Sequence, residues 1–211
     1  MKRLMKLTNN AIVLLSGGLD SCVSLALIRE SFENILTLTF DYGQKSRIHE
    51  IETSRKISEY YSVENKLISI PFLSEVCSSN KDDMYVPNRN ALFVNIAACY
   101  AESMGYNFIV LGANKEESAV YKDNSSNFVS AINASFKNSM NASIELIAPL
   151  INMDKTEIVK TAININFPLE LVYTCYLGEN KNCGECDSCK MFKNALIQNN
   201  KKELLEKIFD R

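Results

Sequence analysis

Short apolar runs alternate along this chain with segments of helical periodicity, and this alternation constrains the fold more than any other feature. The runs are too short for helices and lie at residues 11–15, 35–40, 66–70, 108–111 and 144–148. The helical candidates cover residues 19–30, 48–60, 91–104, 127–139 and 154–163. Strands that are apolar on both faces are typical of a parallel sheet with helices on both sides. The pattern therefore predicts an α/β fold, doubly wound around a mainly parallel five-stranded sheet.

Composition limits the size of the core and the kind of partner. The 211 residues are 46% hydrophobic, with only four prolines and seven glycines, which suits one substantial core. The sequence pattern changes near Phe167, so we expect a main domain over residues 1–166 and a small appendage over residues 167–211. The formal charge of −2 offers no broad basic surface, so nucleic acid is not an expected partner. We find no signal peptide or membrane-spanning run, and we expect a cytoplasmic protein without membrane contact.

The first apolar run passes directly into the sequence SGGLDS, and a helical candidate follows. Glycine lets the backbone turn sharply and approach a ligand, so N–H groups at the start of the helix can bind an anion. We therefore predict a phosphate loop made of Leu15, Ser16, Gly17, Gly18, Leu19, Asp20 and Ser21. Because a carboxylate would repel phosphate, we expect Asp20 either to cap the helix or to help hold Mg²⁺.

The cysteines gather near the end of the chain. Four of the seven lie within fifteen residues, at Cys175, Cys183, Cys186 and Cys189. This spacing is typical of a closed tetrahedral Zn²⁺ site, which stabilises a fold without activating water. An iron–sulfur cluster uses the same ligands and is the alternative. The remaining cysteines, which we expect to be small buried or incidental residues, are Cys22, Cys77 and Cys99.

The hexapeptide SGGLDS resembles the SGGxDS signature of the pyrophosphatase-loop ATPases, which cleave ATP between its α and β phosphates. Together with the cysteine cluster, it resembles the 7-cyano-7-deazaguanine synthase family. Further motifs of that family are matched in order along nearly the whole chain: DYGQ at 41–44, VPNRN at 86–90, GANKEESAVYKDN at 112–124, PL at 149–150 with Lys155, and TCY at 174–176. Such an ordered series is more specific than any single motif.

The resemblance implies an adenine nucleotide alpha hydrolase-like fold and an AMP-forming C–N ligase of queuosine biosynthesis. It implies that ATP adenylates 7-carboxy-7-deazaguanine, that ammonia displaces AMP to give an amide, and that a second ATP dehydrates the amide to the nitrile. The implied cofactors are ATP, Mg²⁺ and Zn²⁺. The implied catalytic residues are Ser16, Asp20, Ser21 and Lys155. The implied substrate-binding residues are Tyr42, Gln44, Arg89, Asn90, Asn114, Glu117, Tyr121 and Asp123.

Some of these residues also have a plain structural interpretation. Arg89 could form a surface ion pair, Lys155 could be an ordinary solvated lysine, and the polar residues of DYGQ could only terminate a strand. His49 is the only histidine, and we expect it on a surface helix without a catalytic role. Residues 193–211 alternate charge with leucine or isoleucine, which predicts a helix packed on the domain or on a second subunit. A homodimer is therefore expected.

The segment at residues 112–124 departs from the family pattern GxNxxDxxxYPDC. It has Glu117 for Asp, Lys122 for Pro and Asn124 for Cys. One extra methylene moves the carboxylate of Glu117 by about 1.5 Å, which is enough to change a tight substrate pocket. The adenylating half of the site is intact, whereas the choice of substrate stays open.

Because the choice of substrate stays open, three other functions are considered. The first joins the deazapurine carboxylate to a macromolecular amine, such as a protein acceptor, as in relatives associated with antiphage systems. The second is an RNA thiolase with an iron–sulfur cluster, against which the near-neutral charge and the lack of a paired catalytic cysteine near Cys22 argue. The third is a nucleotide-binding module that no longer turns over ATP, which the complete phosphate loop disfavours.

Overall fold

The computed structural model describes residues 9–78, 86–178 and 180–210 of the chain. In these ranges five parallel strands form one sheet in the order β3-β2-β1-β4-β5. Their bounds are β1 Asn10–Leu14, β2 Asn34–Asp41, β3 Glu64–Ser69, β4 Phe108–Val110 and β5 Glu145–Ile147. The chain changes direction across the sheet between β1 and β4, and open α/β sheets bind ligands outside the carboxyl ends of their strands at such a point. The predicted doubly wound α/β fold is confirmed.

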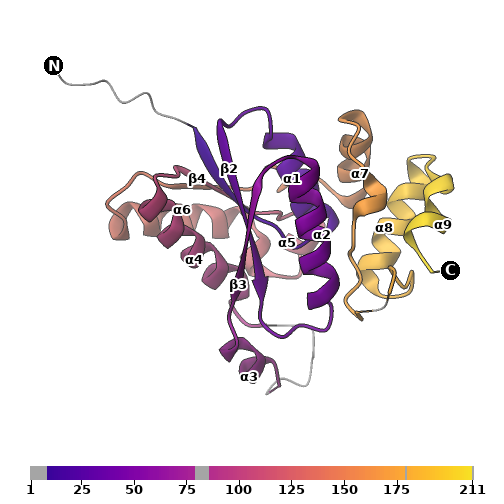
Figure 1. The fold of residues 1–211 in the computed structure, drawn as a ribbon, viewed down its shortest axis with the longest axis horizontal. Helices are drawn as coiled ribbons and strands as arrows, with labels where there is room; N and C mark the ends of the chain where they lie inside the picture. The colour runs from indigo at the N-terminus through magenta and orange to yellow at the C-terminus, as the bar shows by residue number, and fades with distance from the viewer. Residues whose placement is uncertain (1–8, 79–85, 179, 211) are drawn as a thin grey trace.

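Helices cover both faces of the sheet, with α1 and α2 on one side and α4 and α6 on the other (Figure 1). The α-helices of the described residues are α1 Leu19–Ile28, α2 Arg47–Tyr60, α3 Phe72–Ser78, α4 Arg89–Met104, α5 Lys115–Ser118, α6 Ser126–Ser139, α7 Lys155–Asn164, α8 Asp187–Gln198 and α9 Leu205–Ile208. Short 3₁₀ segments are η1 Lys122–Asn124, η2 Leu169–Leu171 and η3 Lys202–Leu204. Across the described ranges, no helix has the length and apolar character needed to cross a bilayer.

Strand β1 contributes to a separate core on each face of the sheet. Ala11 and Val13 belong to the core that includes residues of α1, α7 and α8. Ile12 and Leu14 belong to the core that includes residues of α4 and α6. Successive side chains of a strand point to opposite faces, so a strand covered on both sides must be apolar throughout. This is the physical reason why the apolar runs locate the strands.

The predicted helices correspond to α1, α2, α4, α6 and α7, with ends shifted by a few residues. Helices α3 and α5 were not predicted, because seven and four residues carry too little periodicity. The single tail helix predicted over residues 193–211 is wrong in extent. Helix α8 already begins at Asp187 and ends at Gln198, and Asn200 adopts a left-handed φ of 57°. A left-handed residue interrupts an α-helix, so η3 and α9 follow as separate short pieces.

The C-terminal segment packs directly on the α/β unit. Phe167, Phe192 and Phe209 belong to the same core as the apolar residues of α1 and α7. Thr156 Oγ1 of α7 donates to Gln198 Oε1 of α8 at 2.6 Å, and Asn199 Nδ2 donates to Thr156 O at 3.0 Å. One core therefore continues past residue 166, and the division into a domain and an appendage stays a prediction.

Candidate active site

The chain turns sharply after β1, where Gly17 has a φ of 79°. A Cβ atom at this position would lie 2.8 Å from Thr53 Cβ and 3.2 Å from Glu50 O of α2, so only glycine fits without displacement. Tyr173 N donates to Gly17 O at 3.1 Å and holds the turn from the C-terminal segment. Gly18 is the N-cap of α1 and contributes no side chain. Because the first N–H groups of a helix lack intrahelical partners, the loop can offer them to an anion.

Ser16 and Ser21 fix the phosphate loop through each other. Their hydroxyl oxygens lie 3.1 Å apart, and Ser16 N donates to Ser21 Oγ at 3.2 Å. Ser21 Oγ also interacts with Gly18 O at 3.1 Å. Gly112, just after β4, permits this packing, since a Cβ atom there would lie 2.7 Å from Ser21 N. Ser16 is exposed and Ser21 is buried, so Ser16 offers the hydroxyl that a ligand reaches first.

Lys155 is buried beside the phosphate loop. Asp154 and Glu157 form a capping box that fixes the start of α7, where Lys155 is the first residue. Lys155 Nζ lies 2.5 Å from Asp20 Oδ2 and 3.2 Å from Glu117 Oε1, and the lysine side chain is only 6% exposed. The interpretation of Lys155 as an ordinary solvated lysine is therefore wrong.

Two carboxylates keep Lys155 protonated. Burial alone lowers the pKa of Lys155, but the charges of Asp20 and Glu117 outweigh burial and raise it above its ordinary value. Asp20 Oδ2 also accepts from Asn114 Nδ2 at 3.1 Å, whereas Asp20 Oδ1 is buried with no hydrogen-bond partner among the described residues. Asp20 does not cap α1, whose N-cap is Gly18, so that predicted role is wrong. A carboxylate oxygen without a partner is the type of ligand that Mg²⁺ takes.

Two adjoining cavities lie at the carboxyl ends of the strands. The first has a volume of about 180 Å³ and contains the phosphate loop and Lys155. The second has a volume of about 450 Å³ and contains Gln44, Tyr121 and Asp123. The wall that both cavities share is lined by Tyr42, Glu50, Arg89, Asn90, Glu117, Asn124 and Tyr176. All the predicted ATP- and substrate-binding residues line one of these cavities except Gly17 and Asn114, which are buried.

Arg89 is held against aromatic rings at the shared wall. Its Nη1 atom donates to Tyr42 OH at 3.0 Å, and its guanidinium carbon lies 5.9 Å from the ring centroid of Phe93. Phe93 stacks on Phe40 with 4.1 Å between centroids and an interplanar angle of 7°. Arg89 therefore lies in the wall of the cavities. The surface ion pair considered for it is not found among the described residues.

The segment that departs from the family pattern borders the second cavity. Asn90 N donates to Asp123 Oδ2 at 3.3 Å, and Asn90 Nδ2 donates to Asp123 O at 3.4 Å, which ties η1 to α4. Asn124 is buried at the shared wall, whereas Lys122 is exposed. Tyr121 is 40% exposed and lies at the rim. Two of the departures, Glu117 and Asn124, thus face the cavities and the third faces solvent.

Sequence reasoning missed Glu50, which lines both cavities. Gln44 Nε2 donates to Glu50 Oε2 at 2.9 Å, and Ser46 Oγ donates to Glu50 Oε1 at 2.5 Å. The Gln44 amide also bonds Phe40 O and Tyr42 N, each at 3.0 Å, so it shapes the loop that presents Glu50. Burial raises the pKa of Glu50 against the opposing effect of these hydrogen bonds. The available signal was a carboxylate in the first turn of the helix that follows β2.

His49 supports the site from behind. Its ring is half-buried and stacks on Tyr173, with 4.6 Å between centroids and an interplanar angle of 23°. Tyr173 lines the first cavity. The expected surface position of His49 is therefore only partly met, because one side of its ring packs against this cavity residue. Of the cysteines outside the cluster, Cys22 is buried and Cys99 is exposed, and the side chain of Cys77 lies outside the described residues.

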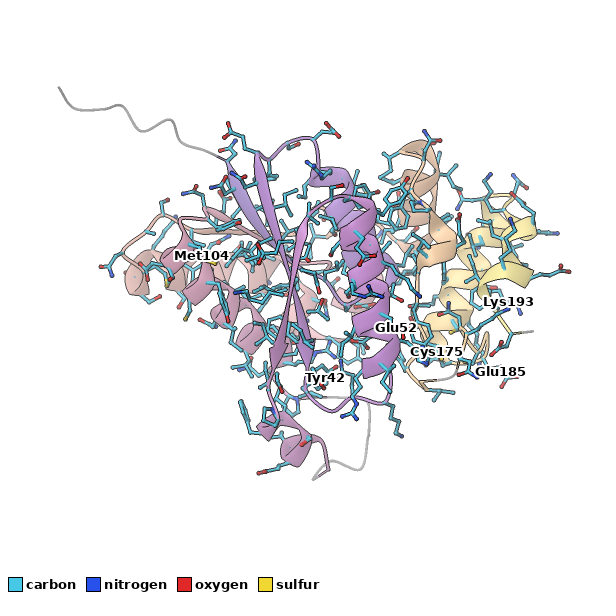
Figure 2. The ribbon with its side chains drawn as sticks, in the orientation of Figure 1. Tyr42, Glu52, Met104, Cys175, Glu185 and Lys193 are labelled. Carbon is cyan, nitrogen blue, oxygen red and sulfur yellow. The ribbon has the colours of Figure 1, made fainter. Side chains whose placement is uncertain are left out.

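Four cysteines converge in the C-terminal segment. The Sγ atoms of Cys175, Cys183, Cys186 and Cys189 all lie within 4.8 Å of one another. Zn–S bonds of about 2.3 Å in a tetrahedron separate sulfurs by roughly 3.8 Å, so this arrangement suits a metal site. Cys183 Sγ accepts from Cys186 N at 3.3 Å and Glu185 N at 3.4 Å. Figure 2 shows Cys175 and Glu185 together in the C-terminal segment, at the same end of the sheet as Tyr42 and far from Met104.

The fold and the four-cysteine cluster define an α/β protein of the adenine nucleotide alpha hydrolase-like type with a candidate metal centre. The model of the family described as Queuosine biosynthesis protein QueC matches residues 10–81 and 74–200. The chain belongs to the QueC family.

Known proteins agree with this assignment. The chain is 39% identical to a 7-cyano-7-deazaguanine synthase of Carboxydothermus hydrogenoformans over 208 residues, which cover 88% of this chain and 97% of that protein. It is also 39% identical to a 7-cyano-7-deazaguanine synthase of Methanosarcina barkeri, in an alignment that covers 94% of this chain and 98% of that protein. Among solved structures, the U34-tRNA thiolase NcsA of Methanococcus maripaludis, described with its [4Fe-4S] cluster, has a TM-score of 0.57 at 17% identity. The match covers 96% of this chain and 69% of that one, and it shows a shared fold only.

Proposed function

We propose that this chain is an ATP-dependent, AMP-forming C–N ligase that converts 7-carboxy-7-deazaguanine and ammonia to 7-cyano-7-deazaguanine. The relatives named 7-cyano-7-deazaguanine synthase support the reaction. The observation that carries the proposal is the ammonium of Lys155, buried between Asp20 of the phosphate loop and Glu117 of the wall that the two cavities share. A fixed positive charge between the proposed phosphate loop and the second cavity would suit adenylation of a carboxylate.

In the first cavity, N–H groups of the phosphate loop and the Ser16 hydroxyl would bind the ATP phosphates. Lys155 would stabilise the charge that develops at the α-phosphate as the substrate carboxylate attacks and pyrophosphate leaves. Mg²⁺ fits beside Asp20, whose Oδ1 atom lacks a hydrogen-bond partner among the described residues, and a bound Mg²⁺ would neutralise phosphate charge. Asn114 would orient Asp20 through its bond to Oδ2.

The deazapurine is assigned to the second cavity and the shared wall. Ammonia attacks the acyl adenylate there and releases AMP, which leaves an amide. A second ATP adenylates the amide oxygen with release of pyrophosphate, and loss of AMP and of the two amide protons gives the nitrile. The residues assigned to substrate binding from the wall and rim are Tyr42, Arg89, Asn90, Glu117, Tyr121 and Asp123. Gln44 is assigned a supporting role, since its amide is committed to the loop and to Glu50.

A structural Zn²⁺ is proposed for the four cysteines. A closed set of four thiolates leaves no position for a reacting water, so the metal would hold the segment around Cys175 in place. An RNA thiolase gains no support from Cys22, because burial raises the pKa of this thiol to about 12 and disfavours a reactive thiolate. A colourless protein with one Zn²⁺ per chain would eliminate the iron–sulfur alternative.

The test of the proposed reaction is a turnover assay. The purified chain is given 7-carboxy-7-deazaguanine, ATP, Mg²⁺ and ammonium, and AMP, pyrophosphate and the base are followed by mass spectrometry. We expect substrate-dependent AMP release and a nitrile product. Absence of AMP with this base would reject both the synthase and the conjugating alternative, and would leave a binding module or another substrate.

The second candidate function is amide formation with a macromolecular amine. It is favoured by the altered segment at the second cavity, where Glu117 and Asn124 face the shared wall. The exposed side chains of Val120 and Tyr121 at the rim suit a larger acceptor than ammonia. In the same assay, AMP release that stalls at the adenylate or amide without nitrile would favour this candidate. A homodimer and a cytoplasmic location remain part of the proposal, and light scattering tests the first of them.

A further inference from the structure

The carboxylate of Glu117 is already engaged at the phosphate side of the site. Its Oε1 atom lies 3.2 Å from Lys155 Nζ, and its backbone N donates to Asn114 Oδ1 at 3.0 Å. Removing this carboxylate from Lys155 to bind a base would leave a buried ammonium with one partner fewer, which is costly. Because Oε1 is committed to Lys155, Glu117 cannot offer two oxygens to a guanine-like ring, and a second carboxylate is needed for the two N–H donors of that ring.

Glu50 has the required free acceptors. A carboxylate offers about four lone-pair positions, and in the described residues one is used on each oxygen, by Ser46 and by Gln44. One position on each oxygen is left. These bonds also fix the carboxylate in orientation, because Ser46 and Gln44 belong to the loop that leads into α2. A fixed pair of acceptors suits two parallel N–H donors on a planar ligand.

Arg89 supplies a complementary donor on the same wall. Its guanidinium has five N–H donors and uses two hydrogen bonds within the described ranges, to Tyr42 OH and Asn90 Oδ1. Among the described residues no ion pair joins Arg89 to Glu50, so Arg89 can still donate hydrogen bonds to a ligand and Glu50 can still accept them. The ring that matches this pair has two adjacent N–H donors beside a carbonyl oxygen. A 2-amino-6-oxo purine-like ring has this pattern at N2, N1 and O6.

Resting on the function proposed above, we propose that Glu50 selects the 2-amino-6-oxo ring of the substrate. Glu50 accepts from N1–H and the exocyclic N2–H, and Arg89 donates to O6. The base then lies along the shared wall, which carries Glu50 and Arg89 as well as Glu117, the partner of Lys155.

The test measures binding rather than turnover. Isothermal calorimetry is run with 7-carboxy-7-deazaguanine and with its 2-deamino analogue, against the wild type, Glu50→Gln and Glu52→Gln. A site that is built to accept a donor rejects the analogue without it, so we expect the wild type to prefer the parent base by about 100-fold. Glu50→Gln should reduce this preference to below about 5-fold, because an amide offers only one acceptor oxygen. Glu52 lies on the same helix, exposed, and pairs only with Lys56 at 3.7 Å in the described structure, so Glu52→Gln should keep the wild-type preference.

Each outcome decides the inference. Equal affinity of the wild type for the two bases overturns it, whether or not Glu50→Gln folds. An unchanged preference in a folded Glu50→Gln protein, checked by circular dichroism, also overturns it. AMP release is measured separately: a wild type that discriminates the bases but releases no AMP rejects the proposed reaction alone. AMP release without discrimination rejects the selector role alone, and no binding of either base rejects both.

Discussion

At the scale of single residues, Lys155 carries its charge where little water reaches it. The side chain is 6% exposed and contacts the carboxylates of Asp20 and Glu117. Burial raises the pKa of Asp20, whereas the charge of Lys155 opposes this rise. A bound Mg²⁺ would favour the ionised form of Asp20 and would add positive charge for the phosphates.

We expect Lys155→Met to lower AMP release by about 100-fold or more, because a fixed positive charge at the transferred phosphate is lost. Steady-state kinetics with 7-carboxy-7-deazaguanine and ATP measure the effect. Lys160→Met is the matched control, since Lys160 is exposed on the same helix, and it should leave the rate within about 2-fold. A Lys155→Met protein that is folded and nearly as active as the wild type would remove Lys155 from the mechanism.

Binding of the deazapurine should weaken as the pH falls. Burial and Asp41 raise the pKa of Glu50, whereas Ser46, Gln44 and Arg89 oppose the rise, and the net direction is upward. The protonated carboxyl has fewer acceptors, so the dissociation constant should increase as the pH falls through this raised pKa. Calorimetry from pH 8 down to about pH 5 detects the loss. Glu50→Gln has no proton to gain and should show a flatter profile; parallel profiles would contradict the assignment.

At the scale of secondary-structure elements, periodicity located the five strands and the five longer connecting helices. It could do so because helices cover both faces of the sheet, so the central strand β1 is apolar and buried from residue 11 to residue 14. The edge strand β3 is less buried and keeps polar residues such as Lys66. The phosphate loop could be predicted from the sequence because a glycine turn between a strand and a helix is a local feature. Glu50 was missed, because its place in the wall depends on the path of the DYGQ loop and on its neighbours in space. The burial of Lys155 was equally hidden, since Asp20 lies 135 residues away in the sequence.

The turn after β1 should not tolerate a side chain. Gly17→Ala places a Cβ atom 2.8 Å from Thr53 Cβ, in addition to the strain of a φ of 79°. We expect a loss of about 2–3 kcal/mol in the free energy of unfolding and weaker ATP binding. Gly105→Ala is the control, because Gly105 has a φ of 75° with no atom within 4 Å of the added carbon. It should lose about 1 kcal/mol and bind ATP normally. Equal losses in urea unfolding would mean that the contact with Thr53 is unimportant.

At the scale of the whole molecule, the C-terminal segment shares the core on one face of the sheet. Its aromatic residues, including Phe192 and Phe209, pack with 5.7 Å between ring centroids. Cys175 and Cys189 belong to this core, Cys183 and Cys186 pack against it, and Cys175 also lines the first cavity. A structural metal here would stabilise both the segment and one wall of the site.

Removal of the metal should therefore destabilise the C-terminal segment. We expect one Zn²⁺ per chain by elemental analysis, and a loss of about 3 kcal/mol or more in unfolding free energy after chelation or Cys186→Ser. Hydrogen exchange should show the largest loss of protection in α8. Cys99→Ser, at an exposed cysteine outside the cluster, should retain the metal. Full stability of the metal-free protein would show that the core alone holds the segment.

The hydrogen bond from Tyr173 N to Gly17 O joins the phosphate loop to the chain that enters the cysteine cluster. Two binding equilibria that share a structural element are thermodynamically linked, and linkage is reciprocal. If metal binding tightens the loop for ATP by a given factor, ATP must tighten the metal by the same factor. Under this linkage, saturating nucleotide would shift a competition between the protein and a chelator for zinc toward the protein, and loss of the metal would weaken nucleotide binding by the same factor.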